Sequence, residues 1–302
     1  MSRYDIEARN GDITLTGSVW TPEDQTPIAL VLMHPGSGPS DRDNDVFFPP
    51  IRDTLLAAGV AVTSFDKRGV GGSGGDWLEA GIEAQAADLV ASLEVAKSSV
   101  PGTPIGLFGH SQGGWVVLEA ALQVPVDFVI TSSGPGVTPR VQEEFSTRNS
   151  LVRTGFGDAE VEDILRVYGE LCDRMTAREG FGEVEAWMRS SERASAFAAL
   201  EHAGAFVPDD EGLWQFATRV IDHDPAPALA ALRVPLLALL GGADNVVPVE
   251  RSAEVFRREV RPELLTLNVV EGGDHRMQFP GTEDFVPGYF PALIEYVTAL
   301  SR

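Results

Sequence analysis

The stretch IGLFGHSQGGWVVLEAAL (105–122) carries the strongest indication of fold in the sequence. An apolar run, IGLF, leads into GHSQG (109–113), and a helical pattern of apolar residues follows. Gly-x-Ser-x-Gly between a strand and a helix is typical of a nucleophile elbow, a sharp turn that exposes the serine hydroxyl. The N-terminus of the following helix favours negative charge that develops beside it. This context predicts that Ser111 is a nucleophile.

Apolar runs like IGLF recur along the chain, and helical patterns separate them. The runs are residues 28–34, 60–66, 105–110, 126–133, 234–241 and 264–272. Strands with nearly continuous apolar sequence are typical of parallel sheets, which are buried on both faces. Between the runs, apolar residues return at three- and four-residue intervals, as at Ile82, Ala86, Leu89 and Leu93. The alternation predicts an α/β fold with a doubly wound, mostly parallel sheet.

The N-terminal segment has a different pattern. Ile13, Leu15 and Val19 share one parity within GDITLTGSVW, and polar residues occupy the other. This alternation predicts a strand with one exposed face, in an antiparallel start to the sheet after the turn at Asn10-Gly11.

The region 137–222 interrupts the alternation of strands and helices. It contains charged, Ala- and Glu-rich amphipathic sequence with scattered aromatic residues and no strand-like run. An insertion after a strand's carboxyl end lies over the place where open α/β sheets bind ligands. We therefore expect a helical cap at 137–222 on a core made of 1–136 and 223–302, with Trp187 and Trp214 as candidate pocket residues. The alternative is a structural elaboration remote from the site.

A serine nucleophile needs a base within reach, because its hydroxyl is a poor nucleophile at neutral pH. The five candidates are His34, His110, His202, His223 and His275. His275 follows the last long apolar run, in EGGDH (271–275), so a loop at a strand's carboxyl end carries it. His110 adjoins the serine in a tight turn, where neighbouring side chains diverge. His275 is therefore the predicted general base.

The base in turn needs an acid that holds its ring in one tautomer. Asp244 directly follows the run 234–241, one strand before the strand of the histidine. The resulting chain order Ser, Asp, His is the order of α/β-hydrolases. Asp274 is the rival, but it adjoins His275 and is poorly placed to reach across the ring. Asp222 and Asp224 are weaker, because they precede the strand rather than follow it.

A tetrahedral intermediate also requires donors aimed at its oxyanion. One predicted donor is the backbone N–H of Gln112, the residue after the serine. The second should come from the loop HPGSGP (34–39), where Ser37 N–H is the first choice and Gly38 the runner-up. Pro35 has no N–H to donate.

The composition restricts the classes of partner. Forty-five acidic and 23 basic residues give the 302-residue chain a formal net charge of −22. Nucleic acid and acidic membrane surfaces are therefore poor partners. Cys172 is the only cysteine, so neither an intrachain disulfide nor a thiolate zinc site is expected. No signal-peptide pattern or membrane-spanning run is evident, which fits a cytoplasmic enzyme, although a chain cut to its mature form would look the same.

Three motifs together make the chain resemble α/β-hydrolases, specifically a bacterial serine carboxylesterase-like branch. They are HPGSGPSDRD (34–43), FDKRGVGGSGG (65–75) and FGHSQGG (108–114). The resemblance implies an eight-stranded, mostly parallel sheet and hydrolysis of a small-molecule, ester-like substrate without metal or organic cofactor. It also implies the roles already predicted for the serine, acid, base and oxyanion donors. This chain has Pro35 where the family usually has glycine.

The charged residues of the first two motifs suggest a network under the loop. Residues 41–43 and 66–68 read DRD and DKR. We expect them to position the loop rather than contact substrate, because ions beneath a catalytic loop more often hold it in place.

Other functions remain open on the sequence alone. A thioesterase, a peptidase or amidase, or an acyltransferase would use the same triad, since all form the same tetrahedral intermediate. A binding protein on an inactive hydrolase scaffold is a more remote alternative, because fold alone does not determine function. Dehalogenase chemistry is set aside, since the elbow carries Ser111 rather than aspartate.

Overall fold

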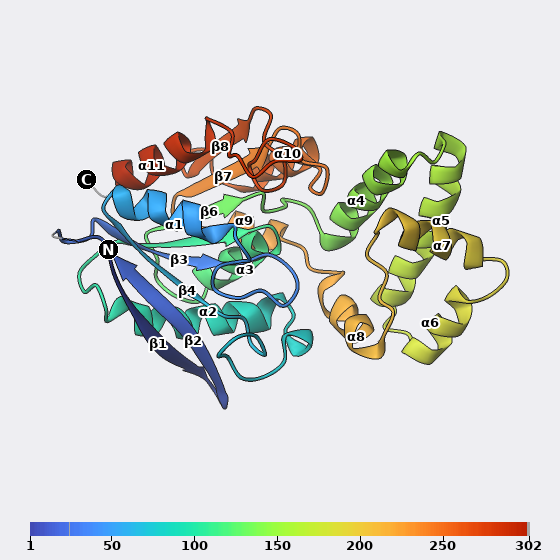
Figure 1. Ribbon diagram of the computed structural model, residues 1–302, viewed down its shortest axis with the longest axis horizontal. Coiled ribbons are helices and arrows are strands. Elements are labelled where there is room, and N and C mark those ends of the chain that lie inside the picture. The colour runs from blue at the N-terminus through green and yellow to red at the C-terminus, as the bar shows by residue number, and fades with distance from the viewer. Residues whose placement is uncertain (24, 301–302) are drawn as a thin grey trace.

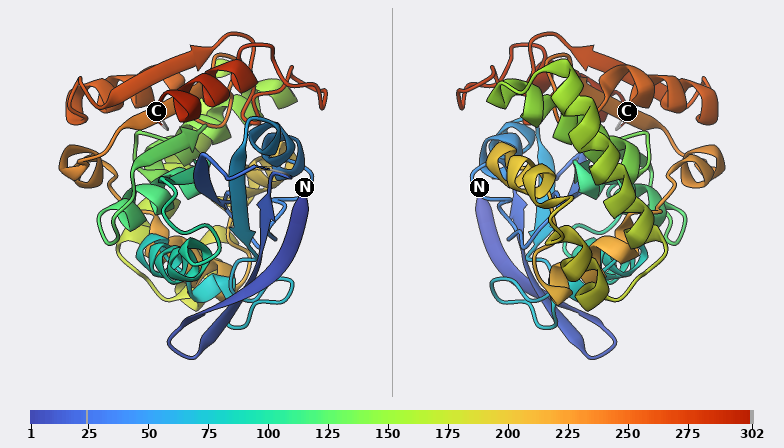
Figure 2. Two further views of the ribbon diagram at one scale, coloured as in Figure 1. Left: turned by 90° about the vertical axis from the view of Figure 1, so that its left-hand side faces the viewer. Right: turned by 90° about the vertical axis from the view of Figure 1, so that its right-hand side faces the viewer.

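The computed structural model describes residues 1–23 and 25–300. Its sheet has eight strands in the order β1-β2-β4-β3-β5-β6-β7-β8. Six are parallel, while β1 and β2 form an antiparallel hairpin that pairs with β4. The strands are β1 Ser2–Asn10, β2 Ile13–Thr21, β3 Ala29–His34, β4 Val60–Phe65, β5 Ile105–His110, β6 Phe128–Ser132, β7 Leu236–Gly241 and β8 Leu265–Val270. In Figure 2 the β1–β2 hairpin curves beyond the rest of the sheet.

Each apolar run forms a strand, and the predicted mostly parallel sheet is confirmed. From β3 to β7 almost every strand residue is buried, as expected for strands covered on both faces. β8 is the exception, because it lies at the edge of the sheet and Val269 is 48% exposed. The prediction of burial on both faces was wrong for this strand.

Helices cover both faces of the sheet (Figure 1). One face packs against α1 Phe48–Ala57 and α11 Tyr289–Leu300. The other packs against α2 Ile82–Lys97, α3 Gln112–Ala121, α9 Ala226–Ala231 and α10 Val249–Glu259. Alternate strand residues enter the two cores, with Leu107 in one and Phe108 in the other. This period of two lets a single apolar strand supply both layers.

Five helices between β6 and β7 form a second body beside the sheet (Figure 1). They are α4 Pro139–Thr154, α5 Asp158–Thr176, α6 Phe181–Met188, α7 Ala194–Ala203 and α8 Glu211–Val220. They enclose an apolar cluster of their own, which includes Leu171 and Trp214. A short 3-10 helix, η1 Trp77–Glu79, contacts α8 from the sheet side. Among the described residues, no helix combines the length and the apolar character that crossing a bilayer requires.

Candidate active site

Ser111 occupies the turn between β5 and α3. Its backbone has φ 53° and ψ −123°, a conformation that L-residues rarely adopt. The Ser111 N–H donates to the carbonyl oxygen of Ser132 on β6 over 3.0 Å. This bond holds the strained turn on the neighbouring strand, as the elbow pattern predicts.

Close backbone packing explains the glycines of the elbow. A Cβ on Gly109 would lie 2.1 Å from the carbonyl oxygen of Gly113. A Cβ on Gly113 would lie 2.6 Å from the carbonyl oxygens of His34 and Pro35. Real Cβ atoms do not approach other atoms this closely, so only glycine allows β5, α3 and the 34–39 loop to meet.

The three predicted triad residues come together at the carboxyl edge of the sheet. Nε2 of His275 lies 2.9 Å from Oγ of Ser111, and Nδ1 of the same ring lies 2.8 Å from Oδ2 of Asp244. The serine follows β5, the aspartate follows β7 and the histidine follows β8. Both ring nitrogens are therefore engaged, and a proton can move between the serine and the imidazole.

The Asp244 carboxylate is fixed on its other side as well. Its side chain is fully buried, and Oδ1 accepts the N–H groups of Val246 and Val247 over 2.7 and 2.9 Å. The rival Asp274 instead accepts the N–H groups of Arg276 and Gln278 within its own turn.

The weaker acid candidates have partners elsewhere. Asp222 accepts the hydroxyl of Thr176, and Asp224 accepts the N–H of Ala226. Asp244 is thus the carboxylate hydrogen-bonded to the His275 ring.

The other histidines lie off the proton path. His110 is buried against Phe47, with ring centroids 4.4 Å apart, and its Nδ1 lies 3.1 Å from the carbonyl oxygen of Ser132. Burial lowers the pKa of His110 well below its usual value. His202 packs near Phe156, and His223 packs near Trp115.

The 34–39 loop passes directly beside Ser111. A Cβ built on Gly36 would lie 3.3 Å from Cβ of Ser111. Ser37 and Gly38 both line the cavity that contains Ser111 and Gln112. Within the described residues, the Ser37 N–H has no hydrogen-bond acceptor in the protein. The geometry leaves this donor available to a ligand.

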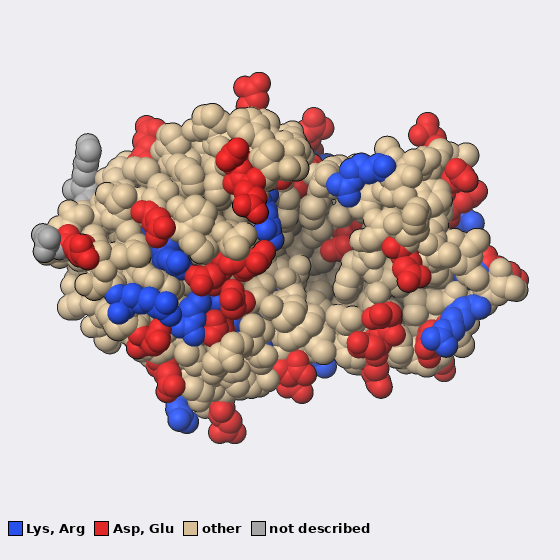
Figure 3. All heavy atoms as spheres, in the orientation of Figure 1, with Lys and Arg blue, Asp and Glu red and all other residues tan. Residues whose placement is uncertain are grey.

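A cavity of about 410 Å³ opens over Ser111 and His275. It lies between the sheet body and the α4–α8 body, where Figure 3 shows a hollow in the surface. Its volume falls in the usual range for small-molecule sites. The larger apolar side chains of its wall include Trp77, Trp115, Met175, Phe206, Phe216 and Ile221.

The structure places Trp187 and Trp214 away from this cavity. Trp214 is fully buried in the core of the α4–α8 body, where its indole N–H donates to the carbonyl oxygen of Glu179. Trp187 packs on Phe197 in the same body, with ring centroids 5.4 Å apart. Neither lines the site. For Trp214 the reason is the rotation of α8, which presents Phe216 to the cavity and Trp214 to the core of its own body.

Comparison with known proteins shows the family. A family model described as serine aminopeptidase, S33, matches residues 43–279, which is more than half of the chain. The chain belongs to this family. It is therefore a serine hydrolase of the α/β-hydrolase superfamily, as the three motifs predicted.

Individual members of the superfamily are similar at low identity. The monoacylglycerol lipase of Mycolicibacterium smegmatis is 25% identical over 271 residues, 88% of each chain. An esterase of Pyrococcus furiosus has a TM-score of 0.61 at 19% identity and covers 99% of this chain and 89% of its own. A proline iminopeptidase of Mycobacterium smegmatis has a TM-score of 0.63 at 16% identity and covers 99% of both chains. The two structural likenesses show the fold.

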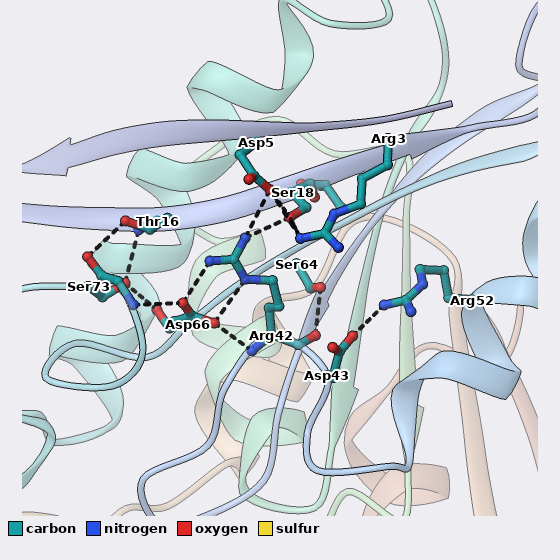
Figure 4. Close-up of polar contacts among 12 residues, drawn as sticks. Arg3, Asp5, Thr16, Ser18, Arg42, Asp43, Arg52, Ser64, Asp66 and Ser73 are labelled. Carbon is teal, nitrogen blue, oxygen red and sulfur yellow. Dashed lines mark hydrogen bonds and ion pairs between the residues drawn. The ribbon is translucent and has the colours of Figure 1, made fainter. Parts of the chain in front are cut away.

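The predicted charged network is present in this hydrolase, although with fewer members (Figure 4). The Arg42 guanidinium binds both carboxylate oxygens of Asp66 over 3.0 and 2.7 Å, and it also contacts Ser18. Asp43 is not part of this pair, because it binds Arg52 instead. The Arg42–Asp66 pair therefore fastens the segment after the 34–39 loop to the end of β4.

Two of the predicted network residues behave differently. Arg68 pairs with Asp88 on α2 rather than with the loop. The Lys67 ammonium contacts the loop directly, since it donates to the carbonyl oxygen of Gly36. Burial lowers the pKa of Lys67 to about 7.

Sequence reasoning missed Glu143, an acidic residue in the wall of the cavity. It lies on α4, and the Gln142 side chain donates to it over 3.3 Å. Burial raises its pKa to about 7. The neighbouring Glu144 pairs with Arg140 on the other side of the helix. Nothing in the sequence distinguishes the two glutamates, because only the rotation of α4 decides which one reaches the site.

Over residues 1–23 and 25–300, no group of three or more His, Cys, Asp and Glu side chains is arranged to hold a metal ion.

Proposed function

We propose that this hydrolase cleaves carboxylic esters through an acyl-enzyme on Ser111. The observation that carries the proposal is the continuous hydrogen-bonded path from Asp244 through both nitrogens of His275 to the Ser111 hydroxyl. Such a path activates an alcohol at neutral pH and keeps the imidazole in one tautomer.

The reaction begins with attack of Ser111 Oγ on the ester carbonyl carbon. His275 Nε2 takes the hydroxyl proton, and the carbonyl electron pair moves to oxygen to form the oxyanion. Collapse of this intermediate breaks the bond to the alcohol, which leaves with the proton from His275. Water then repeats the sequence on the acyl-enzyme and releases the carboxylic acid. Asp244 stays ionised and stabilises the imidazolium in both halves.

Two backbone donors complete the proposed machinery. The N–H of Gln112 lies in the first turn of α3, where helical N–H groups have no intrahelical acceptor. The N–H of Ser37 is the second proposed donor, with Gly38 as its alternative. Both residues line the cavity beside Ser111, which supports this assignment.

The α4–α8 body supports a role as a cap that shapes the substrate pocket. Residues from α4, α5 and α8 line the cavity together with Ser111. We assign residues 137–222 to the cap and residues 1–136 and 223–302 to the catalytic core. The apolar wall favours an uncharged acyl or alcohol chain, and the volume favours a small molecule. Similarity to a monoacylglycerol lipase supports ester substrates.

Peptide hydrolysis is the second candidate, because the family model is described as a serine aminopeptidase. The same triad would attack an amide carbonyl and protonate an amine leaving group.

Fluorophosphonate labelling with mass mapping tests the nucleophile. The label is expected on Ser111 and on no other serine, and labelling elsewhere would overturn the assignment. A panel of a p-nitrophenyl acyl ester, the matched acyl thioester and an aminoacyl p-nitroanilide then identifies the bond. The ester should have the highest kcat/KM, and faster cleavage of the anilide would favour the peptidase.

A further inference from the structure

Lys67 lies directly beneath the loop that carries the proposed oxyanion donor Ser37. Lys67 lies two residues after the end of β4, and it is only 7% exposed. The ammonium group donates to the carbonyl oxygen of Gly36, thirty-one positions earlier in the chain. Lysine is rarely buried unless its charge has a partner, so the burial of Lys67 requires an explanation.

No carboxylate accounts for the burial of Lys67. Two carboxylates line the same small cavity as Lys67, and both are paired with arginines. Asp66 binds Arg42, and Asp88 binds Arg68. Among the described residues, Lys67 forms no ion pair. Its contact with the loop carbonyl therefore offsets part of the loss of hydration.

The Gly36–Ser37 peptide links this contact to the active site. The peptide bond is trans and planar, so the Gly36 carbonyl and the Ser37 N–H point in opposite directions. Any group that fixes the carbonyl also fixes the N–H. The hydrogen bond from Lys67 to the Gly36 oxygen thus determines the direction of the Ser37 N–H.

The two ends of this peptide face two different spaces. Lys67 lines a small cavity beneath the loop together with His34 and Gln85. Ser37 lines the large cavity that contains Ser111. Because the Gly36 carbonyl oxygen faces Lys67, the Ser37 N–H on the opposite side of the peptide faces the cavity in which the oxyanion would form.

We propose that Lys67 is a positioning residue that preorganises the oxyanion hole by holding the Gly36–Ser37 peptide in one orientation. This inference rests on the proposed function. Without the lysine, the peptide can rotate, and the Ser37 N–H is no longer positioned where negative charge develops. Catalysis by such donors depends on their being fixed before the reaction.

The test compares binding of an oxyanion mimic with binding of a neutral analogue. An alkyl trifluoromethyl ketone adds to Ser111 and forms an oxyanion, whereas the secondary alcohol of the same chain length only fills the cavity. In K67M we expect kcat for a p-nitrophenyl ester to fall by about 10²–10³, as when one oxyanion donor is lost, with KM little changed. The ketone Ki should rise by a similar factor, and the alcohol Ki should not change.

Two further variants separate positioning from stability. K67R keeps a long side chain that can donate to the same carbonyl, so it should recover part of the ketone affinity. R68M removes the neighbouring buried cation, which pairs with Asp88 and not with the loop. It should lower the melting temperature and leave the ratio of the two Ki values unchanged. If K67M does not fold, the comparison of K67R with K67Q decides, and K67Q should bind the ketone more weakly.

The inference would be overturned if K67M weakened the ketone and the alcohol equally, or if R68M changed the Ki ratio as much as K67M. The proposed function fails separately, if the wild-type protein neither hydrolyses the ester nor binds the ketone.

Discussion

Nδ1 of His275 lies 2.8 Å from Oδ2 of Asp244, although 31 residues separate them in the chain. Two neighbouring parallel strands, β7 and β8, bring the two loops together at one edge of the sheet. The Asp244 side chain is fully buried, and the His275 side chain is 20% exposed. The buried carboxylate therefore holds an imidazole that still faces the cavity.

Removal of the proposed nucleophile gives the first prediction. S111A should lower kcat for a short p-nitrophenyl ester by at least about 10⁴, because the proton path ends on the missing oxygen. The melting temperature should stay close to that of the wild type. S98A, an exposed serine at the far end of α2, is the control and should keep full activity. Appreciable turnover by S111A would refute the assignment.

Exchange of the proposed triad acid gives the second prediction. D244N should lower kcat by about 10⁴, because an amide stabilises the wrong tautomer of the imidazole. D274N should mainly reduce thermal stability, since that carboxylate accepts backbone N–H groups within its own turn. Steady-state kinetics and melting curves of both variants provide the comparison. A larger loss of kcat in D274N would identify the wrong acid.

The Arg42–Asp66 pair gives the third prediction. R42M should lower the free energy of unfolding by about 1.5–3 kcal/mol, because it removes hydrogen bonds between charged groups and leaves Asp66 without its cation. D5N is the matched control, since Asp5 contacts the same guanidinium from an exposed position and should matter far less. Urea denaturation measures both variants. An equal loss of unfolding free energy in R42M and D5N would show that burial of the Arg42–Asp66 pair does not matter for stability.

Glu143 gives a prediction for pH dependence. Burial raises its pKa from 4.5 to about 7, so between these values the folded chain holds a proton that the unfolded chain releases. Its contribution to stability therefore falls as pH rises from 4.5 to 7 and stays low above 7.

E143Q removes this titration. Its melting temperature should match the wild type near pH 4.5 and exceed it at pH 8. Differences of the same size at both pH values would contradict a raised pKa.

The strands were predictable because each one carries its own burial pattern. The run 105–110 is apolar without interruption, since Leu107 and Phe108 enter opposite cores. The limits of β5 match that run, and the other five parallel strands lie within the predicted ranges. β8 was misjudged, because its place at the sheet edge depends on strand order rather than on its own sequence.

The candidate site was predictable where a local conformation requires particular residues. The backbone of Ser111 and the contacts around Gly109 and Gly113 demand small residues at fixed spacing, which the motif displays. Position after consecutive strands also singled out Asp244 and His275. Their hydrogen-bonded arrangement follows from parallel strands that end at one edge.

The remaining features depend on contacts between distant segments. The rotation of α4 and α8 turned Glu143 and Phe216 toward the cavity, and it turned Trp214 into a separate core. The fold also directed Lys67 to a carbonyl oxygen rather than to a carboxylate. The sequence by itself determined the strands, the elbow and the order of the triad, because local backbone conformation and burial leave a repeating pattern. Only the tertiary structure decided the pocket wall and the support of the loop, because packing between helices and sheet sets which face of each element meets the site.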